Sequence, residues 1–305
     1  MLLLSLSGSI VAVAFPQIMS AFNASIVEAG WVLSIYQIVA TITMPLAGRA
    51  SDIYGSKLVF MICLLFFIAG SLFCALAPNI ILLIVFRFVQ AIAYGGLFPC
   101  AVSIAVEQLP EHRQQAVGLL PTIGAIGQII GPNLGGWMIE AFGWTSVFWM
   151  NVPLVLIILV LSQRFLRGTK KEGGTIDFGS ALLLTGLLSS FMIGITLLGD
   201  KTEKPWLLIG GLFTAFAGFL LAFIKYENKI PNPVIDLQTF RNKPFIAINL
   251  YNLILGACNF GISAFIPFYM VSIYGVSTLI SGAILTPRSI LVIITSAITS
   301  MFIVK

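Results

Sequence analysis

The sequence predicts an all-α integral membrane protein, a helical bundle of about ten transmembrane helices. Its 305 residues are 59% hydrophobic and only 9% charged, whereas soluble domains carry about 25% charged residues. The apolar residues gather in stretches of about 20, the length that an α-helix needs to cross a bilayer. The net charge of +5 lies mainly between these stretches, which indicates membrane orientation rather than nucleic-acid binding.

Ten stretches fit a membrane span. The first has no basic region ahead of it, so we interpret it as a transmembrane helix and not as a signal peptide. The two longest connections, 164–177 and 225–244, are basic and divide the chain into residues 1–165 with six helices, 166–240 with two, and 241–305 with two. The expected spans are 2–22, 31–49, 58–76, 80–104, 116–140, 145–165, 178–198, 205–225, 245–272 and 279–303.

Positive charge predicts which side of the membrane each connection faces. Twelve of the sixteen Lys and Arg residues follow even-numbered spans, and only Lys201 and Lys204 follow odd-numbered ones. Short cytoplasmic loops carry an excess of Lys and Arg. We therefore expect a multi-pass protein of the plasma membrane whose N-terminus is cytoplasmic.

Glycines line one face of the fifth expected span. Steps of three and four residues place them on the same side of a helix, so a neighbouring helix can approach closely, as helices do in lipid. Pro132 removes a backbone donor, and we expect a bend there. A bent, glycine-faced helix suits a protein whose halves rock against each other, and tight packing alone is the alternative. The glycines are Gly124, Gly127, Gly131 and Gly135.

Arg87 lies about two turns inside the fourth expected span. A guanidinium within the bilayer is costly and usually functional, and the alternative is that it reaches back to the membrane surface. All eleven acidic residues lie in loops or at helix ends, so no carboxylate for a proton relay is visible in the middle of the membrane. Arg87 must therefore rely on amides such as that of Gln90, on hydroxyls or on carbonyls.

The connection between the second and third spans is a candidate gate. Gly55 permits a tight turn. Asp52 can accept hydrogen bonds from a helix N-terminus or a cation, and in this way latch the cytoplasmic side. The alternative is a solvated turn with no gating role.

The ninth expected span carries a polar stripe. Asn249, Asn252 and Asn259 follow a helical spacing together with Gly256. Such a stripe should face a cavity or another helix rather than lipid, and hydrogen bonding between helices is the alternative. We expect Tyr36 and Gln37 of the second span to face the same cavity, which makes these residues candidates for a substrate site.

Other chemistry finds little support in the sequence. The four cysteines lie in apolar stretches without a metal-ligand spacing, so no metal site or disulfide framework is predicted. No G-x-x-x-x-G-K-[ST] phosphate loop is present, which argues against ATP as the energy source. We predict no cofactor, no nucleic-acid partner and no enzymatic activity.

Several of these motifs resemble those of the major facilitator superfamily. The pattern G-x-x-x-G-P-x-x-G-G resembles its antiporter motif, and the segment around Arg87 resembles its fourth-helix motif R-x-x-Q-G, with Ala91 in place of the glycine. The connection between the second and third spans resembles its signature G-x-L-A-D-R-x-G-R-K, with Ile53 in place of the arginine. The matching residues are Gly127, Gly131, Pro132, Gly135 and Gly136; Arg87 and Gln90; and Gly48, Asp52, Gly55 and Lys57.

Further segments resemble the fourteen-helix drug:proton antiporters of that superfamily. These are WVLSIY at 31–36, FWMNVP at 148–153 and the first span, LSGSIVAVAFP at 6–16. In the first span Ser7 stands where the family has Asp, and Ala12 where it has Asn. The usual acid of that helix is therefore absent.

The resemblance implies a major-facilitator-type bundle that is incomplete, with residues 241–305 as the first two helices of a C-terminal half. It also implies a secondary transporter that exports small amphipathic, drug-like compounds by alternating access, coupled to protons. In that reading the segment with Asp52 and Lys57 gates the cytoplasmic side, and Arg87 with Gln90 takes part in coupling. The alternative is a truncated membrane fragment without transport activity, or a membrane-embedded binding partner.

Overall fold

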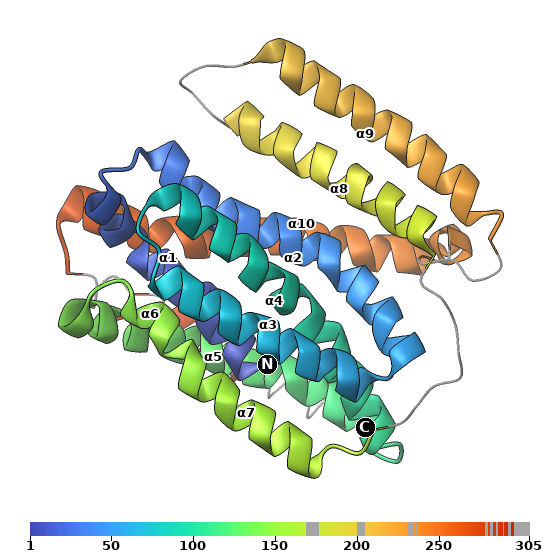
Figure 1. Cartoon of the computed structure of the whole chain (residues 1–305), viewed down its shortest axis with the longest axis horizontal. Helices are drawn as coiled ribbons and strands as arrows, with labels where there is room; N and C mark the ends of the chain where they lie inside the picture. Colours follow the sequence, from blue (N-terminus) through green and yellow to red (C-terminus); the bar gives the residue numbers. More distant parts are fainter. Residues whose placement is uncertain are drawn as a thin grey trace.

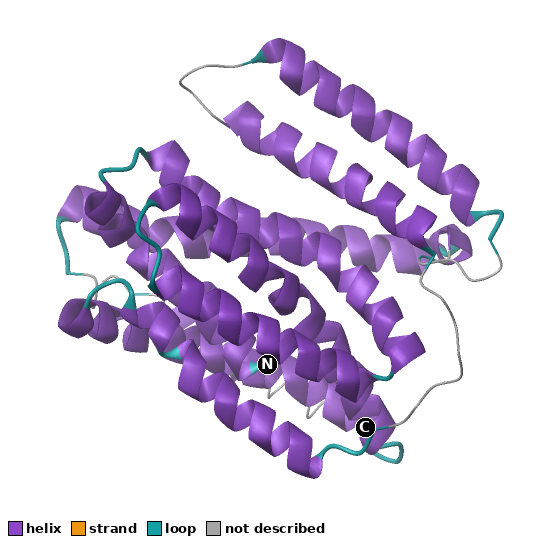
Figure 2. Ribbon diagram, viewed as in Figure 1, coloured by secondary structure: helices purple, strands orange, loops and turns teal. Residues whose placement is uncertain are grey.

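The computed structural model is a bundle of long helices (Figures 1 and 2). It describes residues 1–168, 177–199, 205–230, 235 and 237–277 and scattered positions from 280 to 295, without the side chains of 259–264 and a few others. Its helices are α1 (Leu2–Phe22), α2 (Ile26–Tyr54), α3 (Ser56–Ala75), α4 (Ile80–Gln108), α5 (Arg113–Phe142), α6 (Ser146–Trp149), α7 (Asn151–Phe165), α8 (Phe178–Gly199), α9 (Trp206–Glu227), the 3-10 helix η1 (Leu237–Arg241) and α10 (Lys243–Tyr274).

The expected membrane spans are largely confirmed. Within the described residues, eight helical segments are long and apolar enough to cross a membrane, and they coincide with the first eight expected spans. The ninth expected span, 245–272, falls within α10, a helix of 32 residues. The tenth expected span, 279–303, lies almost entirely outside the described residues.

The sixth span is interrupted. The structure forms it from α6 and α7, which meet at Met150. Pro153 explains the break, because a proline has no N–H to donate to the carbonyl four residues earlier and its ring clashes with that carbonyl. Here that carbonyl belongs to Trp149, the last residue of α6.

The connection predicted at 48–57 is much shorter in the structure. Helix α2 continues to Tyr54 and α3 begins at Ser56, so Gly55 alone joins them. Its φ of +93° lies in the region that favours glycine. The predicted tight turn at Gly55 is therefore confirmed, whereas the placement of Gly48 and Asp52 in a loop is wrong, because both belong to α2.

Local sequence also fixes other helix ends. Ser25 and Glu28 form a capping box at the start of α2, in which the Ser25 hydroxyl accepts from the Glu28 N–H at 3.2 Å and the Glu28 carboxylate accepts from the Ser25 N–H at 2.8 Å. Asn79 caps α4 by accepting from the Leu82 N–H at 2.9 Å. These caps satisfy backbone donors that the first turn of a helix leaves without partners.

Helix α4 lies between α2 and α3, and α1 lies along α5. The α8–α9 hairpin packs on α2 through α8, and α10 contacts α1 (Figure 1). The apolar core around α1 includes Ile10, Ala14, Leu83 and Phe148. The division of the chain at residues 165 and 240 stays a prediction.

Candidate functional site

Arg87 lies at the centre of a hydrogen-bonded network that joins three helices. Its side chain is 2% exposed. Its Nε donates to the carbonyl of Val32 on α2 at 3.3 Å, and its Nη1 donates to Oε1 of Gln90, one turn along α4, at 2.6 Å. Gln90 in turn donates from Nε2 to the hydroxyl of Ser71 on α3 at 2.7 Å. Arg87 is therefore buried and does not reach back to the membrane surface.

Aromatic rings cover the faces of this guanidinium. Its central carbon lies 3.6 Å from the centroid of the Tyr36 ring and 5.8 Å from that of Phe148. Tyr94 packs against Tyr36 with their ring centroids 4.8 Å apart. A cation over an aromatic face is attracted by the negative face of the ring, and more strongly when both are desolvated. All these partners of Arg87 are neutral groups, as the sequence predicts.

Helix α1 borders the same cluster with polar groups. Ser7 and Tyr36 are both 2% exposed. Within the described part of the chain, neither hydroxyl oxygen has a partner in hydrogen-bond geometry. A Cβ placed on Gly8 would lie 3.8 Å from the hydroxyl of Tyr94. The cluster around Arg87 thus contains buried O–H groups that are free to donate.

The glycine face of α5 lies directly against α1. A Cβ added at Gly127 would come within 2.8 Å of Cβ of Ser5, and one at Gly131 would overlap the hydroxyl of Ser9. A Cβ at Gly135 would lie 3.0 Å from Ile10. The predicted common face is confirmed, and α5 runs through Pro132 as one helix. The remaining motif residue, Gly136, is also buried.

Lys57 connects the start of α3 with the end of α7. Its ammonium donates to the carbonyl of Gln163 at 3.2 Å and to that of Leu166 at 2.5 Å. A cation at this position also complements the negative end of the α7 dipole. Asp52 is exposed on the last turns of α2. The gating role of this segment stays a prediction.

Two contacts beside Lys57 were not expected from the sequence. The Ser56 hydroxyl donates to Oε2 of Glu107 at 2.6 Å, and Gln108 donates from Nε2 to the carbonyl of Arg167 at 2.9 Å. They join the ends of α3, α4 and α7 on one side of the bundle. Their members are 51 and 59 residues apart, so no local pattern could have paired them.

The predicted common cavity of the second and ninth spans stays a prediction, and the structure places its described members as follows. Tyr36 is 2% exposed and covers Arg87. Asn249 and Asn252 are exposed on α10, where Asn249 donates to the carbonyl of Phe245 in its own helix at 2.8 Å. Gln37 is half-buried on α2. The side chain of Asn259 lies outside the described residues.

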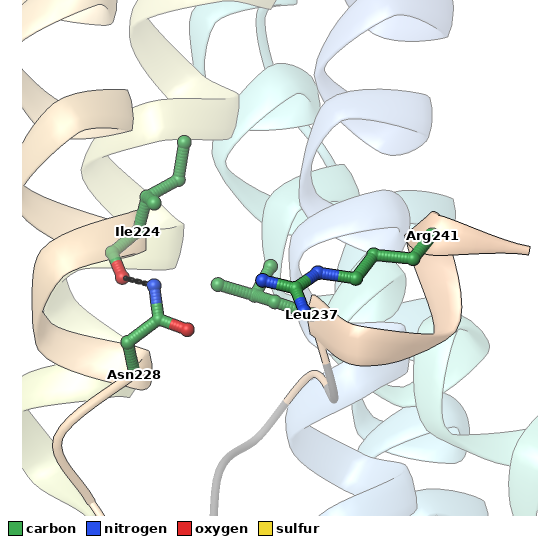
Figure 3. Close-up of a pocket in the computed structure, with 4 residues that line it drawn as sticks. All are labelled: Ile224, Asn228, Leu237 and Arg241. Carbon is green, nitrogen blue, oxygen red and sulfur yellow. Dashed lines mark hydrogen bonds between the residues drawn. The ribbon is translucent and has the colours of Figure 1, made fainter.

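A separate cavity of about 270 Å³ lies between the end of α9 and η1. Figure 3 shows its lining residues, Ile224, Asn228, Leu237 and Arg241. The Asn228 amide nitrogen donates to the carbonyl of Ile224 at 2.7 Å, and Arg241 is exposed at the other wall. This cavity lies in a different part of the chain from the cluster around Arg87.

Known proteins resemble the chain over its whole sequence. Residues 1–305 match the Major Facilitator Superfamily. The Multidrug transporter protein MdtP of Bacillus subtilis (strain 168) is 32% identical over 306 residues, which cover 99% of this chain and 56% of that protein. Multidrug resistance protein 3 of the same bacterium is 31% identical over 303 residues, which cover 99% and 59%. The chain thus spans a little over half the length of these curated relatives.

Solved structures agree with this assignment at the level of the fold. The POT family transporter PepTSo matches with a TM-score of 0.50 and 17% identity, over 76% of this chain and 53% of that one. At this identity the likeness concerns the fold alone. Together with the membrane-spanning helices and the match over residues 1–305, it leads to one conclusion: the chain belongs to the Major Facilitator Superfamily, a family of membrane transporters.

Proposed function

We propose that the chain acts in a secondary transporter that exports small amphipathic, drug-like compounds across the plasma membrane. The observation that carries this proposal is the buried Arg87, held by neutral partners between α2, α3 and α4. A charge in the bilayer is expensive and usually serves transport. The multidrug transporter names of two relatives support the substrate class.

The close contact between α1 and α5 supports movement by alternating access. Ser5 and Ser9 of α1 lie over Gly127 and Gly131 of α5, so two helices with small side chains meet at a smooth interface. Helices that meet in this way can approach closely and shift by small distances. In this proposal the contact lets one part of the bundle rock against another, with Lys57 holding the cytoplasmic ends of α3 and α7 together.

The proposed transport is coupled to protons. Proton relays in membranes use Asp, Glu or His, and the acids of this chain lie in loops or at helix ends. We therefore propose that any coupling carboxylate is Asp52 or belongs to a part of the transporter outside this sequence. The positive charge of the connections supports a cytoplasmic N-terminus.

Reconstitution into liposomes tests the function. A pH gradient is imposed across the membrane, and uptake of a fluorescent lipophilic cation is followed, with protein-free liposomes as the control. Uptake that requires both protein and gradient supports export coupled to protons. If the folded protein produces no uptake, the alternative of a membrane fragment or binding partner without transport activity is the better account.

A further inference from the structure

We propose that the buried cluster around Arg87 binds a small monovalent anion, chloride or an ion of similar size. The inference rests on the contacts of Arg87, Tyr36 and Ser7, and it does not depend on the transport activity proposed above. The site lies between α1, α2 and α4, at the depth of Arg87.

Arg87 carries a positive charge that is buried among neutral groups. Arg87 is 2% exposed, and its hydrogen-bond acceptors are the carbonyl of Val32 and the amide oxygen of Gln90. Both are neutral, as is the Tyr36 ring beneath it. Burial of a charge without a counter-ion is costly, and proteins normally pair such a group. A bound anion supplies the missing negative charge.

The cluster around Arg87 also contains buried hydrogen-bond donors that could bind an anion. An arginine has five N–H groups, and the two hydrogen bonds above use two of them. The hydroxyls of Ser7 and Tyr36 are both buried, and neither has a protein partner in hydrogen-bond geometry among the described residues. Buried polar groups normally have partners, so these O–H groups point to an acceptor that the protein does not itself provide.

The burial of the cluster and its positive charge indicate the size and charge of the occupant. The surrounding side chains of Tyr36, Arg87 and Gln90 are at most 2% exposed, so the site is closed to the outside of the protein, which favours a small ion over a drug-sized molecule. Among the described residues of this cluster Arg87 carries the one positive charge, so one negative charge balances it. Water would satisfy the hydroxyls but would leave the charge of Arg87 without a counter-ion, and the experiment below separates these two occupants.

Thermal unfolding of the purified protein in detergent tests the proposal. Chloride replaces gluconate at constant ionic strength, so that general screening by salt stays the same. An anion that binds only the folded state raises its stability with concentration, and we expect the unfolding midpoint to rise by about 2–4 °C and to keep rising with the logarithm of chloride concentration. Ser7→Ala should require about tenfold more chloride for the same rise, because it removes one donor to the anion.

A carboxylate introduced beside Arg87 gives the decisive comparison. Ser7→Asp places a covalently attached negative charge at the site. This variant should therefore be stable in gluconate, and its unfolding midpoint should no longer rise with chloride. Ser20→Asp puts the same substitution at an exposed position of α1, and it should keep the chloride response of the parent. Because no transport is measured, a failure of the proposed function leaves this result unaffected.

Two results would overturn the proposal. One is a parent protein whose unfolding midpoint is the same in chloride and in gluconate, which is the result expected if water fills the site. The other is a Ser7→Asp variant that responds to chloride as strongly as the parent does. Either result would mean that Arg87 is stabilised by its neutral partners alone.

Discussion

The guanidinium carbon of Arg87 lies 3.6 Å from the centroid of the Tyr36 ring. This contact joins the middle of α4 to α2 and gives a buried cation an aromatic face in place of a carboxylate. The adjacent hydrogen bond from Arg87 to Gln90 fixes the orientation of the guanidinium. Together these contacts hold a charge within the membrane without an ion pair to a described acidic residue.

Substitutions at Tyr36 should separate the role of the ring from that of its hydroxyl. Tyr36→Phe keeps the ring over Arg87, so in chloride-free buffer we expect a change of less than about 1 kcal/mol in the free energy of unfolding. Tyr36→Leu removes the aromatic face and should cost about 2 kcal/mol. Equilibrium unfolding in mixed detergents measures both, and equal losses in the two variants would contradict the cation–π contact.

The contact between α1 and α5 predicts a strong dependence on side-chain size. Gly131→Leu inserts a side chain where even a Cβ would overlap the hydroxyl of Ser9, and overpacking of this kind typically costs about 1–3 kcal/mol. Gly118 lies on the same helix with open space around it, so Gly118→Leu is the matched control. The unfolding free energy and the transport rate are measured for both. If both variants behave like the parent, the glycine face is not a packing surface.

Lys57 should stabilise the end of α7. Lys57→Met removes the donor to the carbonyls of Gln163 and Leu166, and we expect a loss of about 1 kcal/mol because a partly exposed, charged donor is lost. The effect should be local, so hydrogen exchange at residues 163–168 is the measurement. Lys229→Met changes an exposed lysine after α9 and should leave that exchange unchanged. If hydrogen exchange at residues 163–168 is the same in the Lys57→Met variant as in the parent, Lys57 does not cap α7.

The α8–α9 hairpin should weaken in acid. Asp177 accepts from the Ser180 N–H at 2.7 Å and from the Tyr226 hydroxyl at 3.2 Å, and hydrogen bonding to Ser180 holds the pKa of Asp177 below its usual value. Because the folded-state pKa is depressed, this stabilisation is present above the ordinary carboxyl pKa of about 3.9 and is lost as the pH falls through the folded value. Hydrogen exchange at the Ser180 amide measures it.

Asp177→Asn provides the control for this pH dependence. Asparagine caps a helix about as well as aspartate, but it does not titrate. The variant should keep similar protection of the Ser180 amide at neutral pH and should lose the additional decline in acid. A decline of the same size in the variant would show that another group causes it.

Sequence patterns predicted the features that depend on spacing along one helix. Gly124, Gly127, Gly131 and Gly135 share a face because their separations match the helical repeat, and the structure places that face against α1. The separation of acids from the membrane interior predicted neutral partners for Arg87. Spacing within a helix could not identify those partners, because Val32 and Ser71 lie on α2 and α3 and meet Arg87 only when the helices pack.

Hydropathy did not predict the end of α2, because a helix can continue beyond its apolar, membrane-spanning part. It marked residues 48–57 as a connection because many of them are polar, but polar residues such as Asp52 continue a helix without difficulty, and only Gly55 was needed for the turn. The neighbours of the polar stripe on α10 could not be predicted either. Asn249 and Asn252 share a face by their spacing, but spacing does not show what covers that face.

Transport by Arg87 variants tests the central claim most directly. Inverted membrane vesicles contain equal amounts of folded protein, and proton release on addition of a lipophilic cation is recorded. The account predicts proton flux coupled to the cation in the full-length parent transporter, its loss in Arg87→Ala and only a small remaining flux in Arg87→Lys, because lysine keeps the charge but lacks the planar set of donors. Coupled flux at the parent's rate in Arg87→Ala would contradict the account and would leave Arg87 with a purely structural role.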